Sequence, residues 1–195
     1  MEKKRERERE RLEVLVHSLA VLNISDHYVR LKVNGGGGGG CAIVGGLMGT
    51  PGEGGGVEVR STFELPVENG AVDAEFVRER ARQCKQVFPV YDMVGLYTAA
   101  PVSEALRAQV VRLVQGTDLV LLVLNPEDAK KGGVFPVSAY AMGKSGAAFE
   151  RQPLRVVSDE PERIGIEHVA HSGGPKSSQC KIFKHVSRSF FFYQF

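Results

Sequence analysis

The sequence predicts an α/β protein in which helices flank a mixed β-sheet. Strand-like and helix-like segments alternate along most of the 195 residues, as they do where helices pack on a sheet. Residues 118–126, "DLVLLVLNP", contain a continuous apolar run of strand length, which is typical of a sheet interior covered on both faces. Residues 71–88 carry apolar side chains at near-helical spacing and predict an amphipathic helix of about four turns.

The composition is that of a globular domain, with 43% hydrophobic and 25% charged residues. The net charge of +2 gives no argument for a nucleic-acid partner. No apolar run approaches the roughly 18 residues of a membrane span, and the charged N-terminus lacks the apolar segment of a secretory signal. Three widely spaced cysteines without a C-x-x-C pair indicate a reduced intracellular protein with free thiols.

Three segments precede the first glycine-rich stretch. Residues 1–11 alternate Lys or Arg with Glu and predict a solvated extension. Residues 12–17, "LEVLVH", predict a strand because they are rich in β-branched and aliphatic side chains. Ser18 is expected to cap a helix over about residues 19–31.

Two glycine-rich stretches flank the next strand. Six consecutive glycines at 35–40 predict a flexible connector, because a strand follows them instead of the helix N-terminus that a phosphate-binding loop needs. A second cluster over residues 49–56 joins the strand 41–49 to the strand 57–65. Two strands joined by such a turn-rich connection predict a hairpin.

The remaining elements continue the alternation. The helix over 71–88 ends at Pro89, and a second helix is expected from Ser103 to Gly116. The other predicted elements are strands at 91–98, 118–126, 132–142 and 146–159, and a closing helix at 160–171. The predicted order is therefore β-α-β-β-α-β-α-β-β-β-α.

The last residues of the chain differ in character from the rest. They are basic, lack acidic residues and end in an aromatic cluster with neither helical nor strand periodicity. The predicted organisation is a charged extension at 1–11, one domain at 12–171, and a divergent tail at 172–195 that lies outside the fold.

Few residues suggest chemistry by themselves. No G-x-S-x-G nucleophile elbow occurs, and most carboxylates accompany Arg on predicted helices, which indicates ordinary i,i+4 pairing. The five histidines are expected at the surface or as helix caps. His168 and His171 precede Cys180 and His185, which leaves a zinc site formally open, although this spacing matches no common zinc finger.

Six ordered segments carry a resemblance to a known family: "VLNISDHYVRL", "IVGGLMG", "VEVRSTFELPVE", "CKQVF", "VGLYTAAP" and "ERIGIEHVAH". Over about residues 12–171 the chain resembles the MPN-domain family, and within it the non-catalytic branch found in the COP9 signalosome. The resemblance implies an MPN-type fold, a mixed sheet of the cytidine-deaminase-like kind flanked by helices.

The resemblance also implies that the family's active site is empty here. Its catalytic members are zinc isopeptidases, which use a glutamate, two histidines spaced H-x-H and an aspartate past a serine. The glutamate position falls on Ala42, the histidines on Thr98 and Ala100, and the aspartate on about Leu106; Ser103 retains the serine. Because no metal ligand and no general base remain, we expect no catalytic residue, no metal and no cofactor.

The function implied by the resemblance is that of a scaffold. The chain is expected to pair with subunit 5, the catalytic MPN subunit of the COP9 signalosome, in the complex that removes Nedd8 from cullins and so regulates cullin–RING ubiquitin ligases. It is expected in the cytoplasm and nucleus, with no nucleic-acid or membrane partner. Two alternatives stay open: a scaffold subunit of the proteasome lid or of translation initiation factor 3, and a metal-dependent isopeptidase with displaced ligands.

Overall fold

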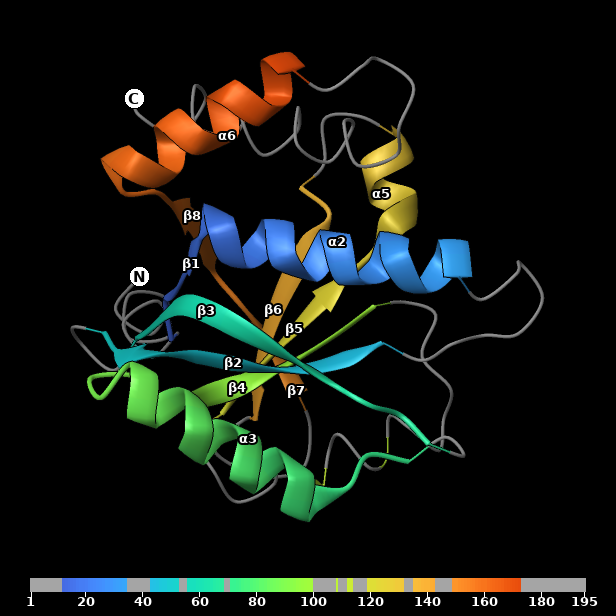
Figure 1. Cartoon of the computed structure of the whole chain (residues 1–195), viewed down its shortest axis with the longest axis vertical. Helices are drawn as coiled ribbons and strands as arrows, with labels where there is room; N and C mark the ends of the chain where they lie inside the picture. The colour runs from blue at the N-terminus through green and yellow to red at the C-terminus, as the bar shows by residue number, and fades with distance from the viewer. Residues whose placement is uncertain are drawn as a thin grey trace, which may run out of the picture.

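The computed structural model describes residues 12–34, 43–52, 56–68, 71–99, 108, 112–113, 119–131, 135–142 and 149–172. The strands are β1 (Val14–His17), β2 (Val44–Pro51), β3 (Val57–Leu65), β4 (Asp92–Ala99), β5 (Val120–Leu124), β6 (Val137–Met142), β7 (Phe149–Gln152) and β8 (Leu154–Val157). The helices are α2 (Ser18–Asn34), α3 (Ala74–Val87), α5 (Pro126–Lys131) and α6 (Glu160–Ser172) (Figure 1).

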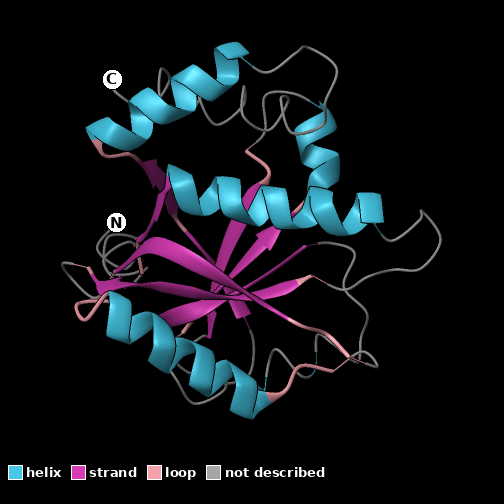
Figure 2. Cartoon of the chain, viewed as in Figure 1, coloured by secondary structure: helices cyan, strands magenta, loops and turns pink. Residues whose placement is uncertain are grey.

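The strands form one eight-stranded mixed sheet in the order β7-β6-β5-β4-β2-β3-β1-β8. Figure 2 shows the strands in magenta between the cyan helices. β1 pairs in parallel with β3 and β8, and β4 pairs in parallel with β5. The remaining pairs, β2–β3, β2–β4, β5–β6 and β6–β7, are antiparallel. The predicted mixed sheet flanked by helices is confirmed, and so is the predicted hairpin formed by β2 and β3.

The two edge strands, β7 and β8, are neighbours in the chain and are separated by Pro153 alone. In a flat sheet of eight strands the edges would lie roughly 33 Å apart, whereas Gln152 and Leu154 can be separated by no more than about 7 Å. The sheet therefore curls until its edges approach each other.

The prediction of a single strand at 146–159 is wrong, because Pro153 has no N–H to donate and interrupts it. The Pro153 carbonyl accepts a hydrogen bond from the N–H of Val14 in β1 (2.9 Å).

A β-bulge in β3 changes which face of the sheet this strand presents. In its pairing with β2, Arg60 is left without a partner between Val59 and Ser61. Val59 packs in the core beneath α2, whereas Phe63 packs in the core against α3. Without the extra residue, these side chains would share a face, because they are four positions apart. The bulge lets one strand contribute to both cores.

Two apolar cores fill the two sides of the sheet, and Figure 1 shows α2 on one side and α3 on the other. The core beneath α2 includes Val14, Val16, Val21, Ile24, Leu47, Val59, Tyr97, Leu122, Leu124 and Ile166. The core against α3 consists of Val44, Met48, Phe63, Leu65, Val72, Val77 and Leu96. Burial on both sides explains why β5 has an almost unbroken apolar sequence.

The helix predicted at 71–88 is confirmed as α3. The Asp73 carboxylate caps it by accepting a hydrogen bond from the N–H of Glu75 (2.8 Å). The short helix α5 was not predicted, although its signals are present in the sequence. Asn125 accepts from the N–H of Glu127 (3.3 Å), and Pro126 stands at the first helical position.

Some predicted segments fall outside the described residues. These are the charged extension, the glycine run at 35–40 and the tail after Ser172. Of the helix expected from Ser103 to Gly116, only residues 108, 112 and 113 are described, and they are helical. Among the helices that the structure describes, none has both the length and the apolar character needed to cross a membrane.

Candidate functional site

Thr98 is the one position of the expected emptied site that lies within the described residues. It stands near the end of β4, between Val44 of β2 and Val123 of β5. Its side chain is buried, and its hydroxyl oxygen has no hydrogen-bond partner among the described residues. Ala42, Ala100, Ser103 and Leu106 are not described, so their grouping around Thr98 stays a prediction.

The residue before Thr98, Tyr97, forms a buried pair with His27 of α2. The phenol oxygen lies 2.8 Å from His27 Nδ1, and the rings meet edge to face at 5.9 Å. Burial lowers the pKa of His27 and raises that of Tyr97, since both charged forms lose hydration. Both side chains are therefore neutral at pH 7. The pair joins α2 to the centre of the sheet.

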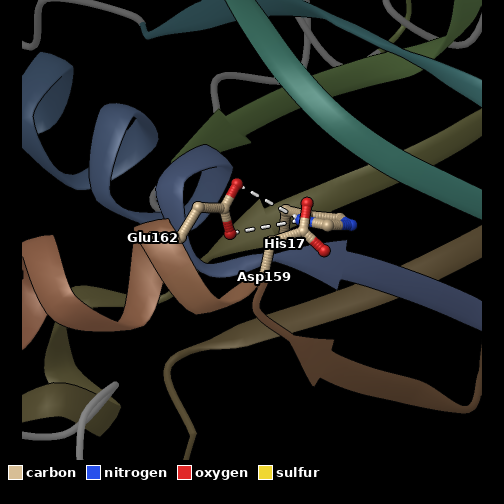
Figure 3. A group of neighbouring side chains, drawn as sticks. All are labelled: His17, Asp159 and Glu162. Atoms are coloured by element: carbon tan, nitrogen blue, oxygen red, sulfur yellow. Dashed lines mark hydrogen bonds and ion pairs between the residues drawn. The ribbon is translucent and has the colours of Figure 1, made fainter.

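A second buried histidine, His17, lies at the end of β1, and Figure 3 shows the carboxylates of Glu162 and Asp159 beside it. Its side chain is 2% exposed. Nε2 lies 2.9 Å from Glu58 Oε1, and Nδ1 lies 3.2 and 3.3 Å from the two carboxylate oxygens of Glu162. Asp159 adds a third carboxylate: one ligand atom from each of His17, Asp159 and Glu162 lies within 4.8 Å of the others.

The register of the sheet and the start of α6 bring this cluster together. β1 pairs with β3 so that Val16 lies beside Val59, which places His17 next to the bulged residue Arg60. The Arg60 guanidinium donates to Glu58 (2.8 Å) and to Asp159 Oδ2 (3.0 Å). It therefore connects β3 to the residue that precedes α6.

Ser18 belongs to the same network and does not act as the predicted cap of its own helix. It is the first residue of α2, and its hydroxyl donates to Glu162 Oε2 (3.2 Å). It also forms a hydrogen bond with the Ser158 hydroxyl (2.9 Å). The prediction of a capping Ser18 is wrong, because this hydroxyl bonds instead to Glu162 of α6 and to Ser158, which precedes α6.

The electrostatics of the cluster favour cations. The hydrogen bond from His17 lowers the pKa of Glu58, the charge of Arg60 adds to this effect, and burial opposes it. Glu58 is therefore ionised at neutral pH. An ionised carboxylate can only accept hydrogen bonds, so each contact between a His17 ring nitrogen and a carboxylate needs a proton or another cation. The arrangement can hold α6 against β1, and it can hold a metal ion.

An apolar groove lies beside this cluster, between α2 and α6. Its volume is about 580 Å³, and it is lined by Leu19, Leu22, Asn23, Asp26, Pro161, Glu162, Gly165 and Ile166. Other exposed apolar side chains, Phe76, Val87 and Phe88, lie on or beside α3. Both regions could contribute to an interface.

The expectation that the histidines are surface or capping residues is wrong for His17 and His27, which are both buried. Their partners Glu162 and Tyr97 are 145 and 70 positions away in the sequence, so no local spacing could identify them. A usable signal was the position of His17 at the end of β1, a strand in which Val14 and Val16 face the core. Ordinary pairing of carboxylates with Arg is confirmed on α2, where Asp26 binds Arg30 (2.8 Å).

The sequence pattern of the family described as "JAB1/Mov34/MPN/PAD-1 ubiquitin protease" matches residues 9–115, more than half of the chain. The chain belongs to this family. The matched residues include β1, β2, β3 and β4, which are four adjacent strands of the sheet, and Thr98 lies in β4.

Three relatives that share one name match most of the chain. The chain is 30% identical to "COP9 signalosome complex subunit 6" of Dictyostelium discoideum, over 82% of this chain and 54% of that protein. It is 28% identical to the protein of the same name from Oryza sativa subsp. japonica, over 84% of this chain and 57% of the relative. It is 24% identical to the protein of the same name from Drosophila melanogaster, over 87% of this chain and 52% of the relative. The chain thus spans about half the length of the relatives it matches.

Proposed function

We propose that this chain is a non-catalytic scaffold subunit of the COP9 signalosome. It pairs with the catalytic MPN subunit of that complex, subunit 5, and so contributes to the removal of Nedd8 from cullins in the cytoplasm and nucleus. The observation that carries the proposal is the match to proteins named as subunit 6 of this complex, over more than 80% of the chain. The domain that provides this function extends over residues 12–171.

The chemistry of the residues at the family's zinc positions supports a role without catalysis. Ala42, Ala100 and Leu106 carry no donor atom that could hold a metal. Thr98 offers a hydroxyl, which is not among the usual zinc ligands, and its side chain is buried in the sheet. A zinc ion that activates water is therefore not supported by these residues, and no step of hydrolysis is assigned to them.

A domain that has no catalytic site can function by binding other proteins through its surface. The two helices predicted at 71–88 and from Ser103 to Gly116 are the candidates for an interface with a partner. The first is α3, on which Phe76 and Val87 are 41% and 70% exposed. Val77 of α3 packs in the core of the domain, whereas Phe76 and Val87 stay exposed and are available to a partner.

The absence of catalysis can be tested on the isolated chain. We expect release of Nedd8 or ubiquitin from a linked substrate at the rate of the buffer control, because the metal ligands and the base are missing. The double substitution Thr98→His and Ala100→His should also be inactive, since the carboxylate ligand and the base are still absent. Fluorogenic-substrate assays with and without a zinc chelator provide the measurement. Cleavage that the chelator abolishes would contradict the proposal.

A further inference from the structure

We propose that His17, Asp159 and Glu162 form a binding site for a divalent transition-metal ion of the Zn²⁺ class, which ties α6 to β1. The site lies where β1 ends and α6 begins (Figure 3). It is separate in sequence from the family's zinc positions around Thr98, and it does not depend on the proposed scaffold function.

The spacing of the ligand atoms suits one ion between His17 and Glu162. Two ligands bound at about 2.0–2.1 Å in tetrahedral geometry lie roughly 3.3 Å apart. Nδ1 of His17 lies 3.2 and 3.3 Å from the two Glu162 oxygens. Asp159 is 56% exposed and can rotate toward the ion from its position within 4.8 Å. Imidazole nitrogen with carboxylate oxygens is a ligand set that Zn²⁺ accepts.

Glu58 and Arg60 are not ligands themselves, but they hydrogen-bond to the ligands and orient them. Histidines that bind metals usually donate their second ring N–H to a carboxylate, which fixes the tautomer and orients the ring. Glu58 accepts in this way from Nε2 of His17 at 2.9 Å and leaves Nδ1 directed at Glu162. Arg60 holds both Glu58 and one oxygen of Asp159. The other Asp159 oxygen is available for a cation.

The charges in the cluster also match a divalent ion. With a neutral His17 ring, the three carboxylates of Glu58, Asp159 and Glu162 face one guanidinium, that of Arg60, which leaves a net charge of −2. A proton on Nδ1 offsets half of this charge, whereas a divalent cation offsets all of it. The Glu58 and Glu162 side chains are 24% and 18% exposed, so water screens their charges less than that of the exposed Asp159.

The test uses the full chain, stripped of metal with a chelator and then titrated with Zn²⁺ against a chromophoric competitor. We expect one ion per chain at this site, and a thermal midpoint that rises by roughly 5–10 °C at a hundred-fold excess over Kd. Glu162→Gln and Asp159→Asn should each lose this ion and this rise. Glu167→Gln on the same helix and the exposed His168→Gln should keep both.

A spectroscopic readout keeps the test independent of folding defects in the variants. In the wild-type chain, binding of Zn²⁺ at Nδ1 of His17 should shift the Nδ1 resonance while Nε2 stays bonded to its proton, which long-range ¹H–¹⁵N spectra of the imidazole resolve. The proposal is overturned if the His17 signals do not change at saturating zinc. It is equally overturned if Glu162→Gln takes up as much zinc as the wild type, since the ion is then held elsewhere in the chain.

Discussion

Gly95→Ala is expected to destabilise the domain severely. Gly95 lies in β4, where a Cβ atom would stand 2.1 Å from the backbone carbonyl oxygen of Val120 in β5 and 3.0 Å from Leu47 Cδ1. A backbone atom in a paired strand cannot move aside, so the two strands would have to separate. We expect a loss of about 3 kcal/mol or more, a large share of the roughly 5–15 kcal/mol that stabilises a typical domain.

The measurement is the thermal midpoint by circular dichroism, which should fall by at least about 6 °C if the variant is recovered in soluble form. Gly165→Ala is the matched control: no atom lies within 4 Å of its Cβ position, and it is a helical residue of α6. Alanine there should stabilise the chain by up to about 1 kcal/mol. A Gly95→Ala variant as stable as the wild type would show that β4 and β5 do not approach as described.

Tyr97→Ala is expected to be the most damaging of the side-chain truncations at the centre of the sheet. Tyr97 is the largest fully buried side chain among the described residues, and its removal leaves a cavity that should cost about 3–5 kcal/mol. It also leaves the buried His27 without its hydrogen-bond partner. Tyr97→Phe separates the two effects, because it retains the ring and should cost only about 1–3 kcal/mol.

Chemical denaturation of these variants gives the free energies of unfolding. Tyr140→Phe is the control, since Tyr140 is only half-buried and its hydroxyl makes no hydrogen bond within the described part of the chain. In a double-mutant cycle with His27→Leu, Tyr97→Phe should cost much less than it does in the wild type. Equal costs in both backgrounds would mean that the hydroxyl and the imidazole do not interact.

The elements that could be predicted from the sequence are those with a local signal. Strand β3 and helix α3 were found at nearly their observed bounds, because alternation over 57–65 and an amphipathic pattern ended by Pro89 are periodic features. The position of β7 and β8 at opposite edges could not be predicted in this way. It depends on the curl of the whole sheet. The sequence near Pro153 indicates only that a strand is interrupted there.

The candidate site was harder to predict for the same reason. Its ligands come from β1, from the residue before α6 and from α6 itself, and they meet only when the sheet edge and the helix have assembled. The bulge at Arg60 adds a residue that period-2 reasoning does not anticipate. By contrast, the assignment of the family's zinc positions to Ala42, Thr98, Ala100 and Leu106 rests on the resemblance to the family, and it stays a prediction.

The central claim, that this chain serves as a scaffold, is tested most directly by its pairing with a catalytic MPN subunit. The chain is co-expressed with the MPN domain of subunit 5 of a COP9 signalosome, and the mixture is analysed by size exclusion with light scattering. The account predicts co-elution as a one-to-one complex at tens of micromolar. If the catalytic domain elutes alone at every concentration, while the chain itself is folded by circular dichroism, the account is contradicted.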